Sequence, residues 1–101
     1  MADVLILEFE DLGPREYEQV NDALGIDMAS GDGLPEGLIV HSAAAGPEGL
    51  VIYEIWRSRE DQERFMAERL GAALAQGGVE GPPARQEWLD LTSHHHRPEQ
   101  G

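Results

Sequence analysis

Short apolar runs separated by turn residues divide the chain into strands and helices. The run Val4–Phe9 has apolar side chains at odd and even positions and is short for a helix, which predicts a strand covered on both faces. Leu38–Ala44 and Leu50–Trp56 predict two further strands, and residues 45–49 between them have the glycine and proline of a hairpin loop. A fourth strand is predicted at Arg85–Thr92.

Two helices are expected between these strands. Pro14 suits the first turn of a helix, where its missing N–H would have had no partner, and apolar residues follow at helical spacing as far as Leu24, before Gly25. The second helix is predicted to begin after Ser58, its cap, and to end at the glycine pair 77–78. Its expected buried stripe comprises Phe65, Met66, Leu70, Ala73 and Leu74.

The order β-α-β-β-α-β predicts one α+β domain over residues 1–92. It is the ferredoxin-like split βαβ arrangement, in which an antiparallel four-stranded sheet has both helices on one face. The loop Ile26–Gly37 is expected to be ordered because it contains apolar residues to bury, and loops of this length are often functional. The polar segment 93–101 is predicted to be a disordered tail.

Both faces of the predicted sheet are apolar. The opposed sets are Val4 and Ile6 against Leu5, Leu7 and Phe9, Ile39 against Leu38 and Val40, and Val51 and Ile55 against Leu50 and Ile52. A monomer would therefore expose a large apolar patch, so the sequence predicts a homodimer whose sheets face each other. The alternative is a monomer whose second face is covered by the loop and tail, but those segments are polar.

Composition narrows the classes of partner. Twenty acidic against seven basic residues give a net charge of −13, which disfavours nucleic acids and anionic membranes. No apolar run approaches the roughly 20 residues of a transmembrane helix. Without cysteine there is no disulfide and no thiolate nucleophile or metal ligand. We therefore expect a cytoplasmic protein.

Three segments resemble a known superfamily. They are Leu-Pro-Glu-Gly-Leu-Ile-Val-His at 34–41, Ile-Tyr-Glu-Ile-Trp-Arg-Ser at 52–58, and residues 65–70. With the order of elements they are similar to the dimeric α+β barrel superfamily, in particular to small proteins of the antibiotic biosynthesis monooxygenase type, over about residues 3–92. Members of that superfamily include cofactor-free oxygenases acting on polycyclic phenols, haem-degrading oxygenases, lactone isomerases and polyketide cyclases, so fold analogy does not choose one activity.

His41 is the first candidate for chemistry, because it lies in an apolar strand and histidine titrates near neutral pH. If the hairpin is symmetric about Pro47, His41 lies opposite Tyr53. A register shift of one residue would place it with Glu54 and Trp56 instead. His41 is then a general base or a donor to a bound carbonyl, or else a core histidine hydrogen-bonded to backbone or Tyr53.

Other polar and aromatic residues extend this candidate site. Glu54 could orient His41 or act as an acid, although an ion pair across the dimer or with Arg57, Arg85 or Arg15 is favoured. Asn21 could hold a carbonyl or a haem propionate, or reach water at a helix boundary. The predicted catalytic residues are His41 and Tyr53, and the predicted ligand-binding residues are Asn21, Glu54, Trp56 and Met66.

The residues leave three functions open. The first is an enzyme acting on an aromatic or polyketide-like molecule without metal or flavin, with a monooxygenase or cyclase activity. The second is a non-catalytic dimeric accessory or stress-related protein. The third, implied by the resemblance, is a haem-binding barrel with His41 as axial ligand. We expect no cofactor and no metal site, since His94-His95-His96 falls in the polar tail without a carboxylate at fixed geometry.

Overall fold

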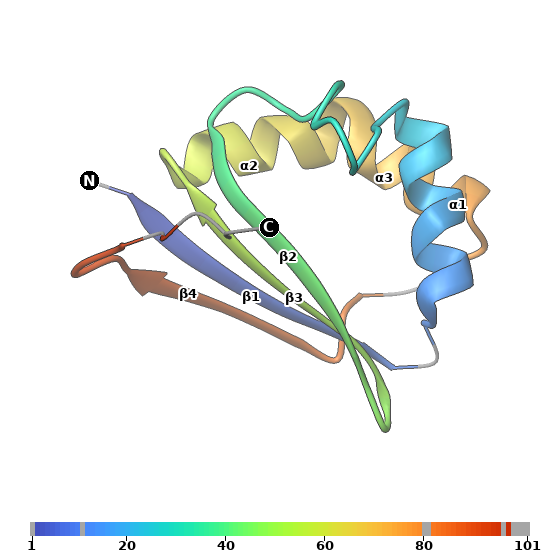
Figure 1. Cartoon of the computed structure of the whole chain (residues 1–101). Coiled ribbons are helices and arrows are strands. Elements are labelled where there is room, and N and C mark those ends of the chain that lie inside the picture. Colours follow the sequence, from blue (N-terminus) through green and yellow to red (C-terminus); the bar gives the residue numbers. More distant parts are fainter. Residues whose placement is uncertain (1, 11, 80–81, 96, 98–101) are drawn as a thin grey trace.

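The computed structural model describes residues 2–10, 12–79, 82–95 and 97, and its elements follow the predicted order (Figure 1). The strands are β1 (Asp3–Glu10), β2 (Leu38–Gly46), β3 (Gly49–Trp56) and β4 (Arg85–Asp90). The helices are α1 (Pro14–Leu24), α2 (Arg59–Phe65), the π-helical turn η1 (Met66–Leu70) and α3 (Gly71–Gln76). Residues 96 and 98–101 of the predicted tail, including one histidine of the 94–96 cluster, lie outside the described residues.

The four strands form one antiparallel sheet in the order β2-β3-β1-β4. All helices lie on one face of this sheet, and the other face has no helix over it (Figure 1). The predicted ferredoxin-like split βαβ fold is therefore confirmed. No helix among the described residues is long and apolar enough to cross a membrane.

Helix α1 begins at Pro14 and ends before Gly25, as predicted. Pro14 is its first residue, and the amide of Gly13 donates to the carboxylate of Glu16 at 3.0 Å. Gly25 ends the helix in the left-handed conformation at φ 75°, where its N–H donates to the carbonyls of the preceding turn. This left-handed residue redirects the chain into the loop 26–37.

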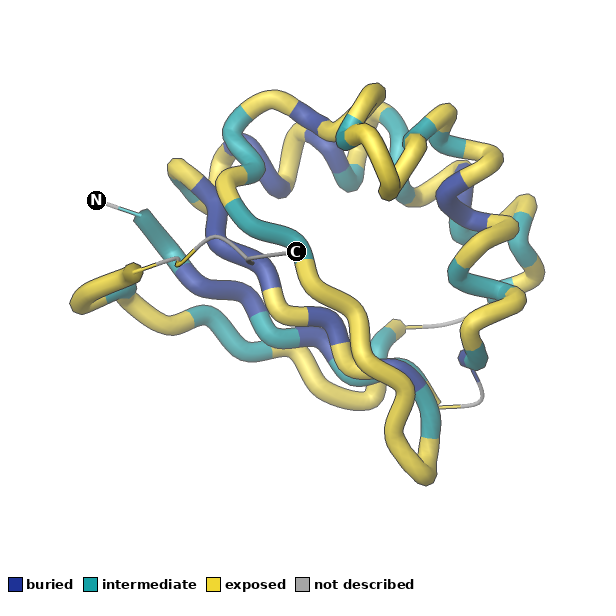
Figure 2. The backbone as a smooth tube through the Cα atoms, in the orientation of Figure 1, coloured by how far each residue is buried: buried dark blue, intermediate teal, exposed yellow. Residues whose placement is uncertain are grey.

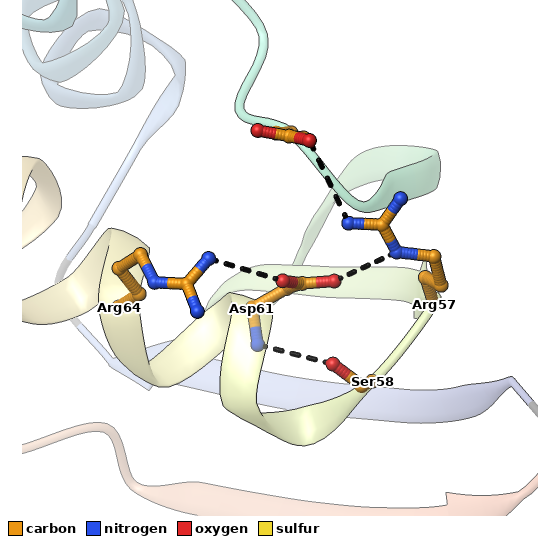
Figure 3. A network of polar contacts seen from close by, with 5 residues as sticks. Arg57, Ser58, Asp61 and Arg64 are labelled. Carbon is orange, nitrogen blue, oxygen red and sulfur yellow. Dashed lines mark hydrogen bonds and ion pairs between the residues drawn. The ribbon is translucent and has the colours of Figure 1, made fainter.

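The second helical segment begins at the predicted cap. The hydroxyl of Ser58 accepts a hydrogen bond from the amide of Asp61 at 3.2 Å. The Asp61 carboxylate in turn pairs with Arg57 at 3.1 Å and Arg64 at 3.4 Å (Figure 3). The helix predicted as one element is divided by the π-helical turn η1, which the sequence pattern did not indicate.

A bulge in β2 corrects the predicted register. Leu38 pairs with Trp56 and Val40 with Ile55, so Ile39 is the extra residue between them. Leu38 and Val40 therefore lie on opposite faces of the sheet, and their predicted position on one face was wrong. Beyond the bulge, His41 pairs with Glu54, which is the second of the two predicted registers.

Side chains fill one half of the space between the sheet and the helices, the half next to α2. Its largest fully buried side chains are Leu5 and Trp56, and the indole of Trp56 packs on Phe65 with ring centroids 5.9 Å apart. These residues come from the ends of β1 and β3 that lie next to α2. Figure 2 shows that the buried positions of the sheet are concentrated on its central strands, β1 and β3.

The uncovered face of the sheet is partly apolar, as predicted. Val51, Tyr53 and Leu89 are exposed there, by 37–44% of their surface, while Val4 and Ile55 on the same face are buried within the chain. Ile39, in the bulge, is 55% exposed. The exposed apolar patch is therefore smaller than the alternation alone predicts.

Candidate functional site

The other half of the helix–sheet interface is hollow. A pocket with about 640 Å³ of space not filled by atoms, part of it an open mouth, lies between the sheet and α1. Its floor includes Leu7, Leu50 and Ile52, while the loop 26–37 contributes residues at one side. Its lining is mostly apolar with few polar groups, as is common for small-molecule sites.

Four polar side chains line this pocket, according to the residues that the structure describes. They are Tyr17 and Asn21 on successive turns of α1, His41 on β2 and Glu54 on β3. Helical spacing places Tyr17 and Asn21 on one face, and the paired register places His41 beside Glu54. All other described lining residues are apolar.

These side chains form a continuous chain of hydrogen bonds. The Tyr17 hydroxyl lies 2.5 Å from Nε2 of His41, and Nδ1 of His41 lies 2.7 Å from Oε2 of Glu54. The second carboxylate oxygen of Glu54 accepts from the indole N–H of Trp56 at 2.9 Å. The structure thus links a phenol, an imidazole, a carboxylate and an indole.

The direction of each hydrogen bond follows from what each group can donate. Burial raises the pKa of Tyr17, the Asn21 side chain lowers it, and the negative charge of Glu54 raises it further, with a net upward shift. Tyr17 therefore keeps its proton at neutral pH and donates it to Nε2. His41 then has its own proton on Nδ1 and donates it to Glu54. In this arrangement Nε2 has a lone pair that accepts from the Tyr17 hydroxyl.

Glu54 is buried without a permanent cation. Among the described residues of this chain, its predicted ion pair with Arg57, Arg85 or Arg15 is not found: Arg57 pairs with Asp61 and Glu36, and Arg85 with Glu8 and Glu87. Glu54 is instead held by N–H groups of His41 and Trp56. No buried polar side-chain atom among the described residues is left without a partner.

The structure separates the predicted site residues into two groups. Asn21, His41 and Glu54 line the pocket. Tyr53 does not lie with His41, because it pairs with Ser42 and is 41% exposed on the uncovered face. Trp56 is fully buried in the filled half and reaches the site only through Glu54. Met66, in η1, is not among the lining residues.

Sequence reasoning did not identify Tyr17 as a functional residue. Tyr17 is one of the residues at helical spacing between Pro14 and Leu24 from which the first helix was predicted. The available signal was its position four residues before Asn21, which places two polar groups on the face that packs toward the sheet. The contact of Tyr17 with His41 joins α1 to β2 across the pocket, and neither element alone signals it, so it was not predictable from the sequence.

The arrangement suits proton transfer at Nε2. A lone pair on Nε2 can accept a proton from a bound molecule, and the Glu54 carboxylate then stabilises the imidazolium through Nδ1. Iron ligation by His41, as in the haem hypothesis, would have to displace the Tyr17 hydroxyl from the same nitrogen. The described residues contain no group of three metal-ligating side chains.

Comparisons with known proteins show which solved structures have a similar fold. No family model matches the chain, and no curated protein matches it. The solved structure of an antibiotic biosynthesis monooxygenase-type protein from Chloroflexus aurantiacus superposes with a TM-score of 0.66 at 17% identity, covering 95% of this chain and 98% of that one. This chain has the fold of the antibiotic biosynthesis monooxygenase-like proteins.

Two Streptomyces oxygenases share the fold, with equal TM-scores to this chain. A monooxygenase from Streptomyces coelicolor, solved in complex with the ligand nanaomycin D, has a TM-score of 0.54 at 19% identity over 96% of this chain and 91% of that one. SnoaB, a cofactor-independent oxygenase from Streptomyces nogalater, has a TM-score of 0.54 at 15% identity over 97% of both chains. The resemblance to this type of protein is confirmed for the fold of the single chain.

Proposed function

We propose that the pocket binds a flat, neutral, largely apolar small molecule and that His41 removes a proton from it. The observation that carries this proposal is the hydrogen-bond chain Tyr17–His41–Glu54 in a pocket that is otherwise apolar. Nε2 of His41 is the acceptor, and Glu54 holds the ring and offsets its positive charge once it is protonated. Asn21 is the further polar group available to a ligand oxygen.

Charge defines the class of ligand. The described lining residues include no arginine, and the chain has no lysine. Glu54 adds a negative charge at the pocket floor, and the whole chain has a net charge of −13. A carboxylate or phosphate ligand would meet repulsion without a compensating cation. Neutral phenols and ketones meet no such cost.

Removal of one proton from such a ligand begins two reaction types. A phenol or a methylene beside a carbonyl becomes an electron-rich anion, which can attack an internal carbonyl in a cyclisation or transfer electrons to molecular oxygen. In the second case one oxygen atom replaces the two hydrogens of the methylene and the other leaves as water. SnoaB, a cofactor-independent oxygenase with the same fold, supports the second reaction.

Anthrone, a neutral tricyclic ketone with an acidic methylene, tests the proposal. In deuterium oxide without oxygen, the protein is expected to catalyse exchange of a methylene hydrogen for deuterium, followed by proton NMR. With oxygen present, anthrone and one O₂ would give anthraquinone and one water. His41→Gln is expected to slow the exchange by about 10²-fold or more, because the base is lost.

Tyr53→Phe is the matched control for this experiment. Tyr53 lies on the uncovered face, so its hydroxyl has no access to the pocket and its loss is expected to leave the exchange rate unchanged. Anthrone that binds without any exchange above the rate in buffer would refute proton removal from this ligand class and favour the non-catalytic binding protein. An equal loss in both variants would show that His41 is not the base.

We also propose that two copies pair through the uncovered sheet face, and that the protein is cytoplasmic. Val51, Tyr53 and Leu89 form an exposed apolar patch there, which soluble proteins commonly cover. Sedimentation velocity at micromolar concentration is expected to give the mass of two chains. Leu89→Glu would then shift the mass to one chain, since it places a charge within the patch, and a single-chain mass for the unchanged protein would refute the pairing.

A further inference from the structure

Nε2 of His41 is already occupied in the empty pocket. Nδ1 is held by Glu54, so Nε2 is the only ring nitrogen that a ligand can use, and the Tyr17 hydroxyl lies 2.5 Å from it. A ligand therefore reaches the base either by displacing Tyr17 or by passing its proton through Tyr17. These two routes give opposite expectations for a tyrosine without its hydroxyl.

The pair of rings shows how a phenol fits this nitrogen. The Tyr17 and His41 rings are within 4° of parallel and their centroids are 5.9 Å apart. With the hydroxyl 2.5 Å from Nε2, this spacing corresponds to rings lying edge to edge and nearly coplanar, too far apart for face-to-face contact. The side chain of Tyr17 is itself a phenol, so its position shows how the hydroxyl of a phenolic ligand could bind to His41.

We propose that Tyr17 is a built-in competitor that holds the position of the ligand's own hydroxyl, and that a phenolic ligand binds by displacing it from His41. This deepens the proposed function and rests on its pocket, because it names the ligand as a neutral phenol and Tyr17 as the residue that limits access to the base.

Displacement has a low cost for Tyr17. Asn21, one helical turn further along α1, lines the same pocket wall and is available as a partner for a displaced Tyr17 hydroxyl. Tyr17 is only half-buried and sits at the pocket wall, close to the protein surface. By contrast, His41 and Glu54 are anchored in the sheet and stay in place.

Exchange of one phenol for another also explains selectivity. A ligand with a hydroxyl returns to His41 the hydrogen bond that Tyr17 gave up, whereas a ligand without one leaves Nε2 buried and unpaired. The unmodified protein is therefore expected to bind 1-naphthol about fivefold or more tightly than 1-methoxynaphthalene, which has the same ring system but no O–H. 1-Naphthoate is expected to bind more weakly than either, because it is anionic.

Tyr17→Phe is the decisive variant, with Tyr53→Phe as its control. Removing the competitor is expected to tighten 1-naphthol binding about fivefold, the equivalent of one hydrogen bond, as measured by isothermal titration calorimetry. Anthrone exchange is expected to be retained or faster. In Tyr53→Phe both values are expected to match those of the unmodified protein.

Weaker or unchanged 1-naphthol binding in Tyr17→Phe would overturn the competitor proposal, and so would loss of anthrone exchange, which would show a relay through Tyr17. These failures are distinguishable from failure of the proposed function: that function fails when the unmodified protein exchanges no anthrone hydrogen, whatever Tyr17→Phe does. The variant keeps the aromatic ring, and a urea unfolding curve verifies that it is folded.

Discussion

Two buried carboxylates, Asp61 and Glu54, have equal burial and different partners. Asp61 is 8% exposed and Glu54 is 7% exposed. Asp61 lies at the start of α2 between the guanidinium groups of Arg57 and Arg64, and the hydrogen bond from Arg57 is the main reason why its pKa is lowered. Glu54 has no arginine and accepts only from His41 and Trp56.

The difference separates a structural charge from a chemical one. Arginine keeps its proton at any ordinary pH, so the charge of Asp61 is permanently compensated and cannot take part in proton transfer. An imidazole, unlike a guanidinium, has a neutral form that can accept a proton, so the partner of Glu54 is not a permanent charge. Two carboxylates of similar exposure thus have different surroundings: permanent cations at the start of α2, and ring N–H groups beside the pocket.

Replacing the Glu54 carboxylate by an amide of the same shape is expected to have the largest effect on anthrone exchange. In Glu54→Gln the indole of Trp56 still donates to an oxygen, so the new NH₂ faces His41. Nδ1 must then accept, the ring proton moves to Nε2, and the base is lost. Anthrone exchange is expected to fall by about 10²-fold, comparable to loss of a general base.

Asp61→Asn is the matched control for that variant. It removes the charge between Arg57 and Arg64 and is expected to destabilise the start of α2 while anthrone exchange stays unchanged. Proton NMR of the exchange and urea unfolding of both variants give the two readouts. A comparable loss of exchange in Asp61→Asn would remove the distinction between the two carboxylates.

Loss of the indole N–H of Trp56 is expected to have the next largest effect, which is on the free energy of unfolding. Trp56→Phe leaves one oxygen of buried Glu54 without its donor, and an unpaired buried group costs about 1–3 kcal/mol of unfolding free energy. Trp88→Phe is the control, because Trp88 is half-buried under the guanidinium of Arg59 and has no bond to Glu54. Urea unfolding is expected to show the larger loss for Trp56→Phe, and equal losses would contradict this role.

The helix cap next to Asp61 gives a smaller, purely structural effect. Ser58→Ala removes the acceptor of the Asp61 amide and is expected to cost about 1 kcal/mol. In a domain of this size that corresponds to a fall in Tm of about 4–8 °C, measurable by calorimetry. Anthrone exchange below the new Tm is expected to be unaffected, whereas a change in exchange would mean that the two halves are coupled.

Acid is expected to remove the stability that Asp61 contributes, and alkali the stability that Tyr17 contributes. The pKa of Asp61 is lowered in the folded chain, so its contribution is fully present above the ordinary value of 3.8 and is lost as pH falls through the folded value. The pKa of Tyr17 is raised, so stability falls as pH rises above 10.0. Urea midpoints against pH are expected to lose the acid dependence partly in Asp61→Asn and the alkaline dependence partly in Tyr17→Phe.

Periodicity and turn chemistry predicted the fold and only part of the site. Strand alternation and the caps at Pro14, Gly25 and Ser58 are local signals, so the elements and their order could be predicted. The hairpin loop sets the register that places His41 opposite Glu54, and the sequence left this register and the one opposite Tyr53 open. The tertiary contact between Tyr17 and His41 joins two elements that are distant in the chain and leaves no local signal, so it could not be predicted.

The ring nitrogens of His41 test the account most directly. In ¹⁵N-labelled protein at pH 7, with the His41 signals assigned by their absence in His41→Gln, the account predicts a protonated Nδ1 and an unprotonated Nε2. Addition of 1-naphthol is then expected to shift the Nε2 resonance while Nδ1 remains protonated. A proton on Nε2 in the ligand-free protein, whether or not Nδ1 also has one, would leave no lone pair to act as the base and would contradict the account.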